Sequence, residues 1–306
     1  QDYSDKQLCD FLQFGWPANY MREWPLQCDF RNHPSALQFP AAIDAFLAKE
    51  MQHSAIVGPF PSKPFEPWSQ INPLMTRPKR SSPDRRVILD LSWPLEVSTN
   101  SGIPKDIYCY EPFKLRLPTV DQVCAMIIKH LPTPWLWSLD LSRAYGQLRS
   151  CPLDWPLLCI LWQGMFFFHV SIPFGLIWGA MAMERTSSAV CWLLAQQGID
   201  STVYIDDFLG CADRQTDGHR HQSAAARLLD LLGLERAAEK DTLPTRIIDY
   251  LGIRFNTIDM TMEVTPDRLQ EIRMLLQSWS SKTAATRHML QVLLGKLFFI
   301  SHTVRS

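Results

Sequence analysis

Two adjacent carboxylates, Asp206 and Asp207, are the residues of this chain with the clearest potential for chemistry. They lie between the short apolar stretches 202–205 and 208–210, a pattern typical of a β-hairpin with the acidic pair at its tip. Neighbouring carboxylates repel each other, and the usual reason for a fold to hold them together is a hard divalent cation, which takes oxygen ligands. The sequence therefore indicates a metal site, although an isolated Asp-Asp pair more often lies in a solvated turn.

A third acid, Asp140, follows the apolar and aromatic stretch 135–139. This stretch predicts a buried strand, whose terminal Asp could simply cap the next turn. However, an acid at a strand end and acids at a hairpin tip can face each other across a sheet and hold two cations about 4 Å apart. That arrangement suits in-line nucleotidyl transfer, in which one metal activates a 3′-hydroxyl and the other stabilises the pyrophosphate leaving group.

Periodicity and turn residues predict the elements that must position these acids. The expected helices are 36–53, 119–131, 177–197, 219–233, 266–279 and 284–301. The expected strands are 86–91, 135–140, 166–172, the Tyr204 hairpin, and a second hairpin of 249–255 and 260–264. Residues 57–84 are proline-rich and should be extended, and residues 1–35 show no clear periodicity. The order suits an α+β fold, an antiparallel sheet with helices on one face.

Composition sets the broad class of the protein. The 306 residues are 46% hydrophobic, which indicates one to three globular domains. Eight cysteines without a CxxC pair predict reduced thiols rather than a zinc site or a disulfide framework. No apolar stretch is long enough for a membrane span and no signal peptide is visible, so we expect an intracellular protein without a membrane partner. The missing initial Met suggests a piece of a longer product.

Charge is distributed unevenly along the chain. The net charge is −1, which is unusual for a nucleic-acid-binding protein. Residues 77–86, however, carry five bases and one acid. This segment is either a solvated loop or a site that binds phosphate groups.

Three motifs, in one order, resemble those of a reverse transcriptase. They are 139–145 (LDLSRAY), 173–176 (PFGL) and 204–207 (YIDD). The form of these motifs resembles that of retrotransposon polymerases of long-terminal-repeat and DIRS type. The downstream stretches 250–253 (YLGI) and 294–299 (LGKLFF) favour a DIRS-like element. The resemblance covers roughly residue 40 to the end.

The resemblance implies an RNA-directed DNA polymerase with a right-hand fold. The palm would be 119–147 and 173–264, the fingers 36–118 and 148–172, and the start of the thumb 265–306, after an N-terminal extension, 1–35, without an assigned role. The cofactor would be two Mg²⁺ ions, with Mn²⁺ as a substitute. The partners would be an RNA or DNA template with its primer and dNTPs, with ribonuclease H and other retroelement domains outside this chain.

The resemblance also implies a role for individual residues. Asp140, Asp206 and Asp207 would be catalytic metal ligands, helped by the backbone carbonyl of Leu141. Tyr145 would exclude a ribose 2′-hydroxyl, its alternative being a core tyrosine. The other nucleotide-binding residues would be Lys79, Arg86, Phe174, Gly175 and Lys240, and the primer or template contacts would be Tyr204, Leu251, Gly252 and Lys296. Lys240 would protonate the leaving pyrophosphate, its alternative being a solvated surface lysine.

Two alternatives to this function stay open. One is another palm polymerase, such as an RNA-dependent RNA polymerase, but Tyr145 argues against it because a ribonucleotide needs room for its 2′-hydroxyl. The other is a catalytically inactive retroelement remnant that acts as a binding module. The three intact acids argue against that decay.

Overall fold

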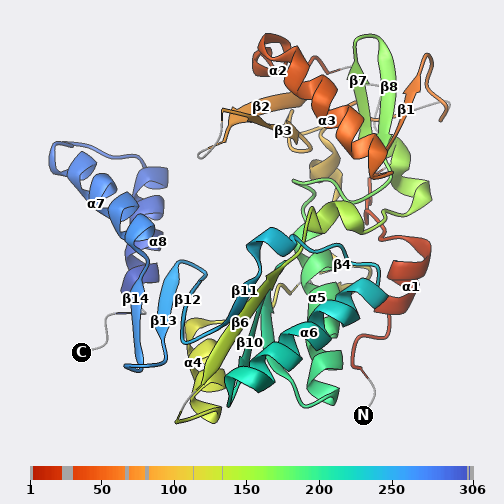
Figure 1. Ribbon diagram of the computed structural model, residues 1–306. Coiled ribbons are helices and arrows are strands. Elements are labelled where there is room, and N and C mark those ends of the chain that lie inside the picture. Colours follow the sequence, from red (N-terminus) through yellow and green to blue (C-terminus); the bar gives the residue numbers. More distant parts are fainter. Residues whose placement is uncertain are drawn as a thin grey trace. The chain divides into compact units, whose positions relative to one another are not determined.

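The computed structural model describes residues 3–22, 30–65, 69–79, 83–112, 114–132, 134–301 and 303 (Figure 1). The chain divides into two compact units, the first made of 1–117 and 141–189 and the second of 118–140 and 190–306. Within the described ranges, no helix has the length and apolar character needed to cross a membrane.

The first unit consists of small antiparallel sheets and short helices. Its main sheet has the strand order β1 (Ile56–Phe60), β8 (Met165–His169), β7 (Cys159–Trp162). The other strands form two hairpins, β2 (Leu74–Pro78) with β3 (Arg85–Leu89), and β4 (Ile107–Tyr108) with β5 (Glu111–Pro112). The helices are α1 (Leu8–Phe14), α2 (Pro34–Gln38), α3 (Pro40–Gln52) and the first part of α5 (Gly179–Gln196).

Helices α2 and α3 together replace the single helix predicted over 36–53. They are separated at Phe39, which has φ −129° and ψ 59°. The cause is Pro40, whose ring disfavours a helical conformation in the residue before it. The described residues of the proline-rich stretch 57–84 contribute most of β1 and all of β2, and the predicted extended conformation is found in these strands.

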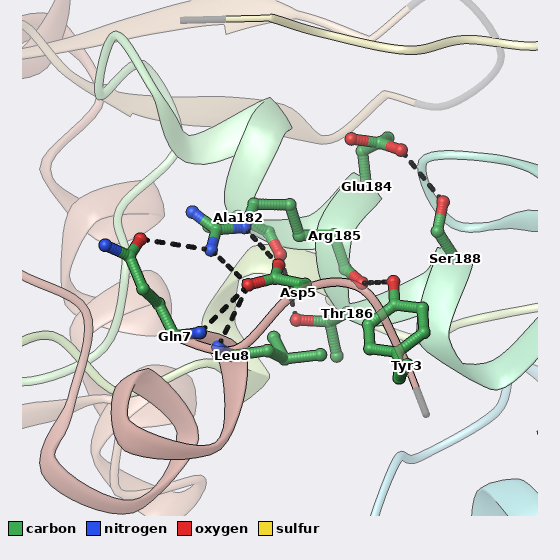
Figure 2. Close-up of polar contacts among 9 residues, drawn as sticks. All are labelled: Tyr3, Asp5, Gln7, Leu8, Ala182, Glu184, Arg185, Thr186 and Ser188. Carbon is green, nitrogen blue, oxygen red and sulfur yellow. Dashed lines mark hydrogen bonds and ion pairs between the residues drawn. The ribbon is translucent and has the colours of Figure 1, made fainter. Parts of the chain in front are cut away.

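The N-terminal segment, which shows no clear periodicity in sequence, contacts α5 chiefly through the carboxylate of Asp5. Asp5 forms a two-pronged ion pair with Arg185, at 2.6 Å to Nε and 2.7 Å to Nη2. The same carboxylate accepts the backbone N–H groups of Gln7 and Leu8 at the start of α1, as Figure 2 shows. The segment also lines a cavity of about 750 Å³ together with Glu184.

The second unit is built on an antiparallel sheet in the order β11 (Thr242–Thr245), β6 (Trp135–Asp140), β10 (Asp207–Ala212), β9 (Asp200–Tyr204). A second sheet consists of β12 (Ile247–Tyr250), β13 (Ile253–Asn256) and β14 (Thr261–Val264). The helices are α4 (Val120–Lys129), the rest of α5, α6 (Gln215–Leu231), α7 (Pro266–Ser280) and α8 (Arg287–Ser301).

Helices pack on both faces of the main sheet. Helix α6 contacts β6, β10 and β11, and its Gly218 lies against Ala212. Helix α4 instead shares a core cluster with Leu209, Cys211 and the residues of β12 and β13. Because neighbouring residues of a strand point to opposite faces, Cys211 and Ala212 mark the two faces. The prediction that helices cover one face only is therefore wrong.

The N-terminus of α4 agrees with the sequence-based expectation. Thr119 accepts the backbone N–H of Gln122, and the Gln122 side chain accepts the backbone N–H of Thr119, which makes a capping box. This cap fixes the helix that leads into β6, the strand that ends at Asp140.

The second sheet differs from the predicted hairpin. Leu251 and Gly252 have φ values of 54° and 80°, so the chain turns there and the predicted strand 249–255 is divided into β12 and β13. After β14, helices α7 and α8 are joined through Glu271, which pairs with Arg268 at 3.1 Å and with Lys296.

Candidate active site

The three acids predicted as metal ligands lie at one end of the β6–β10 pair. Asp207 is directly opposite Asp140 in the antiparallel register. Residues in such positions have Cβ atoms about 4.5–5.5 Å apart and point to the same face. Asp206 lies in the turn between β9 and β10, just after Ile205, whose φ is 62°. The hairpin therefore brings two acids from one turn beside an acid from the neighbouring strand.

The concentration of negative charge is visible in the pKa values of the hairpin acids. Burial, a hydrogen bond with Asp140 and the charge of Asp206 together raise the pKa of Asp207 to about 7. Burial and the charge of Asp140 also raise the pKa of Asp206. Carboxyl groups with raised pKa values are disfavoured in their charged form, so a cation placed among them would stabilise the site.

One positive side chain already reaches this cluster. Lys240 Nζ lies 2.7 Å from Asp140 Oδ1. The hydrogen bond to Asp140 is the main reason why the pKa of Lys240 is raised. The sequence left open whether Lys240 is a solvated surface residue, and the structure places its ammonium on an acid of the cluster.

The cluster fits a hard divalent cation, because each carboxylate offers oxygen ligands. Its three carboxylates also carry more negative charge than the single Lys240 ammonium can balance. In the part of the chain that the structure describes, no three His, Cys, Asp or Glu side chains are gathered closely enough to hold a metal ion as they stand. A bound cation would therefore have to draw the carboxylates together.

Two hydrogen bonds that the sequence analysis missed hold the cluster in place. Tyr250 Oη donates to the carbonyl oxygen of Asp207 at 3.0 Å, which ties β12 to the acidic hairpin. The backbone N–H of Ala237 donates to the carbonyl oxygen of Asp140 at 2.8 Å. No sequence signal pointed to either bond, because both join residues far apart in the chain.

The first unit holds the predicted nucleotide-binding residues around the Pro-Phe-Gly turn. The rings of Tyr145 and Phe174 make an edge-to-face contact with centroids 5.4 Å apart, and the Phe174 side chain is 62% exposed. Gly175 has a φ of 102°, and its carbonyl oxygen accepts Nδ2 of Asn100 at 2.9 Å. Asn100 therefore fixes this turn. Leu141, also in the first unit, is buried.

The described residues of the basic segment 77–86 are 77–79 and 83–86, at one end of the β2–β3 pair, where Arg77 is opposite Arg86. Arg86 is exposed, whereas the Arg85 guanidinium stacks on the Phe39 ring at 3.7 Å. Lys79 Nζ lies 3.7 Å from Asp84 Oδ2. Arg80, the base next to Lys79 in the sequence, lies outside the described residues.

The predicted primer and template contacts all belong to the second unit. Tyr204 is opposite Asp207 in the β9–β10 register. Leu251 and Gly252 form the turn between β12 and β13, and the Gly252 carbonyl oxygen accepts the backbone N–H of Thr265 at 3.1 Å. Lys296 lies on α8 and is paired with Glu271. The structure brings Tyr204 to the acids, whereas Lys296 is paired with Glu271 of α7.

No protein-family model matches the sequence, and a search of curated proteins gives no match. Solved structures of the foamy viral protease-reverse transcriptase are similar in fold. The complex with double-stranded DNA is 14% identical with a TM-score of 0.67, over 92% of this chain and 44% of that chain. The complex with an RNA/DNA hybrid is 14% identical with a TM-score of 0.65, over 92% and 33%. The native prototype foamy virus enzyme is 17% identical with a TM-score of 0.57, over 93% and 36%. The chain thus spans less than half of each of these proteins.

Proposed function

We propose that this chain is the polymerase portion of an RNA-directed DNA polymerase, a nucleotidyltransferase encoded by a retrotransposon of long-terminal-repeat or DIRS-like type. The observation that carries the proposal is the cluster of Asp140, Asp206 and Asp207, with Asp207 directly opposite Asp140. The likeness in fold to reverse transcriptases solved with DNA and with an RNA/DNA hybrid supports it.

In this proposal the three carboxylates, with the Leu141 carbonyl, hold two Mg²⁺ ions, for which Mn²⁺ can substitute. When bound, the ions would lower the pKa of a primer 3′-hydroxyl and neutralise charge on the leaving pyrophosphate. The raised pKa of Asp207 supports this assignment, because its charged form is disfavoured despite the nearby Lys240 and would be stabilised further by a bound cation. Tyr250 and Ala237 position the acids by fixing the backbone of Asp207 and Asp140.

The remaining predicted residues take substrate-binding roles in the same proposal. Tyr145 would select deoxynucleotides by filling the space of a 2′-hydroxyl, and Phe174 supports its ring. Arg86 and Lys79 would bind the triphosphate of the incoming dNTP. The Leu251–Gly252 turn, Tyr204 and Lys296 would contact the template and primer. Ribonuclease H and other retroelement domains would be supplied outside this chain.

A primer-extension assay tests the proposal directly. The chain is incubated with poly(rA)/oligo(dT), dTTP and Mg²⁺, and product length is followed by gel electrophoresis. Extension is expected for the parent and should be lost in Asp206→Asn, because a neutral amide is a poor Mg²⁺ ligand. Circular dichroism of the variant controls for folding.

Other results of the same assay would support the alternatives. Extension with ribonucleotides in preference to deoxynucleotides would indicate an RNA-dependent RNA polymerase. Duplex binding without extension, in the parent as in Asp206→Asn, would indicate an inactive binding module. Equal extension by the parent and Asp206→Asn would exclude the hairpin as the catalytic centre.

A further inference from the structure

The ion pair between Lys240 and Asp140 has a consequence for metal binding that the two-metal proposal alone does not contain. Lys240 Nζ lies 2.7 Å from Asp140 Oδ1. The Asp140 side chain is 16% exposed and the Lys240 side chain 59%. The carboxylate is thus largely enclosed, and the lysine approaches it from solvent.

The backbone around Lys240 holds it beside Asp140. Ala237 donates its N–H to the Asp140 carbonyl oxygen, and Lys240 donates its N–H to the Ala237 carbonyl oxygen, both at 2.8 Å. Arg236 Nη1 pairs with Asp241 Oδ2 at 2.7 Å. Because these contacts hold the backbone on both sides of Lys240, the fold positions the ammonium group beside the Asp140 carboxylate.

An ammonium ion and a divalent cation compete for the same carboxylate. Each stabilises the negative charge of Asp140, and the two cations repel each other. The lysine side chain is flexible and strongly hydrated, so it can leave for solvent at low cost. We infer that Lys240 is an internal counter-ion, which occupies Asp140 in the metal-free protein and is displaced when a divalent cation binds; this rests on the metal site of the proposed function.

Neutralising Lys240 should therefore have opposite effects on the two states. Without metal, Lys240→Gln leaves three carboxylates without their cation, so the melting temperature should fall. With metal, the competitor is gone and the affinity for a divalent cation should rise. Exposed ion pairs make modest contributions, so we expect Mn²⁺ to bind about two- to fivefold more tightly. Lys240→Arg keeps the charge and should bind Mn²⁺ as the parent does.

The test is a Mn²⁺ titration of the full chain, followed by the electron paramagnetic resonance signal of free Mn²⁺. The variants are Lys240→Gln, Lys240→Arg, Asp206→Asn and the matched control Lys129→Gln. Lys129 Nζ lies 4.0 Å from Asp200 Oδ2, so the control removes the same charge from another exposed ion pair of this unit. Only Lys240→Gln is expected to bind more tightly, and its gain in melting temperature on adding Mg²⁺ should exceed that of the parent.

The outcomes separate this inference from the function on which it rests. If Asp206→Asn loses Mn²⁺ binding while Lys240→Gln binds no more tightly than the parent, the metal site stands and the counter-ion inference is wrong. If Lys240→Arg binds as tightly as Lys240→Gln, charge is not the cause and the inference is again wrong. If the parent and Asp206→Asn bind Mn²⁺ equally, both the metal site and the inference fail.

Discussion

His169 is a buried imidazole whose neutral form is favoured in the folded first unit. It ends β8, is 5% exposed and lies 6.3 Å from the Phe46 ring. Among the described residues, neither of its ring nitrogens has a hydrogen-bond partner. Burial therefore lowers the pKa of His169 to about 3, from an ordinary value of 6.5.

This pKa predicts an acid-dependent loss of stability. The unfolded chain takes up a proton at His169 below about pH 6.5 and the folded chain does so only near pH 3, so its contribution is complete above pH 6.5 and is lost as the pH falls. The slope for one proton is at most about 1.4 kcal/mol per pH unit. His169→Leu should reduce the pH dependence measured by urea denaturation from about pH 7 to about pH 4.5.

A matched variant makes that measurement specific. His53 is exposed, so His53→Gln should leave the pH dependence of the parent unchanged. An equal slope in the parent and in His169→Leu would mean that His169 finds a proton acceptor when the protein is in acid.

Tyr145 allows a test of sugar selection at the same scale. Its ring contacts Phe174 edge to face, and Tyr145→Val removes the aromatic volume that would exclude a 2′-hydroxyl. We expect the ratio of kcat/KM for dNTP over rNTP to fall by about tenfold or more. Tyr110→Val, which changes a tyrosine that is 91% exposed, is the control. An unchanged ratio would assign Tyr145 to the core and favour the RNA-polymerase alternative.

At the scale of elements, the pairing of β6 with β10 depends on the close packing of a glycine against a tryptophan. A Cβ at Gly210 would lie 2.0 Å from Cζ2 of Trp137, its partner across the two strands. Trp137 is fully buried, so the indole cannot move to solvent. The close approach of this glycine and this indole keeps the strands paired along the register that places Asp207 opposite Asp140.

Gly210→Ala is accordingly expected to destabilise the protein by about 1–3 kcal/mol, the usual range for overpacking a core. Gly295→Ala is the control, because Gly295 lies on α8 with no atom within 4 Å of its added Cβ and should gain about 0.5–1 kcal/mol. Chemical denaturation followed by circular dichroism gives both values. Trp137→Leu should recover part of the loss in the Gly210→Ala background, and strictly additive effects would contradict the steric explanation.

Local signals explain which elements the sequence could predict. The apolar and aromatic stretch 135–139 and the Thr119 cap identified β6 and α4, whose ends depend on nearby residues. Helix α1 was missed because it is held by Asp5 and Arg185, which are 180 residues apart. The β12–β13 turn was missed because Leu251, an apolar residue, adopts a positive φ there.

The candidate site follows the same pattern. The three acids could be selected from sequence because each ends an apolar stretch, and the strand register then brings Asp140 and Asp207 together. The contact of Lys240 with Asp140 spans 100 residues and has no local signature. The pairing of Lys240 with Asp140 follows only from the fold, which brings the segment after α6 beside the end of β6.

At the scale of the whole molecule, a net charge of −1 provides little general attraction for nucleic acid. In the proposed function, binding of phosphate groups would then depend on local basic clusters such as the end of the β2–β3 pair. At that end, Arg85 is held by Phe39 and Lys79 lies beside Asp84, whereas Arg86 is exposed. Arg77 is exposed as well, but Arg86 is the arginine with a predicted nucleotide-binding role, so its removal distinguishes nucleotide binding from duplex binding.

We expect Arg86→Ala to raise the KM for dNTP by about tenfold, the effect of losing a charge-assisted hydrogen bond. The dependence of duplex Kd on salt should stay that of the parent. Arg77→Ala, which removes the same charge from the opposite position of the hairpin, is the control. A salt slope reduced by about one unit with an unchanged KM would instead show that Arg86 contacts template backbone.

The two contacts of the Asp5 carboxylate limit how far the N-terminus of this protein can be truncated. That carboxylate neutralises Arg185, whose side chain is 15% exposed, and it also caps α1 (Figure 2). Removing Asp5 by truncation would leave the largely buried Arg185 guanidinium without this counter-charge, at a far larger cost than losing a surface ion pair. Expression fragments that begin at residue 8 should therefore be less soluble than fragments that retain Asp5, even though both keep every motif of the acidic site.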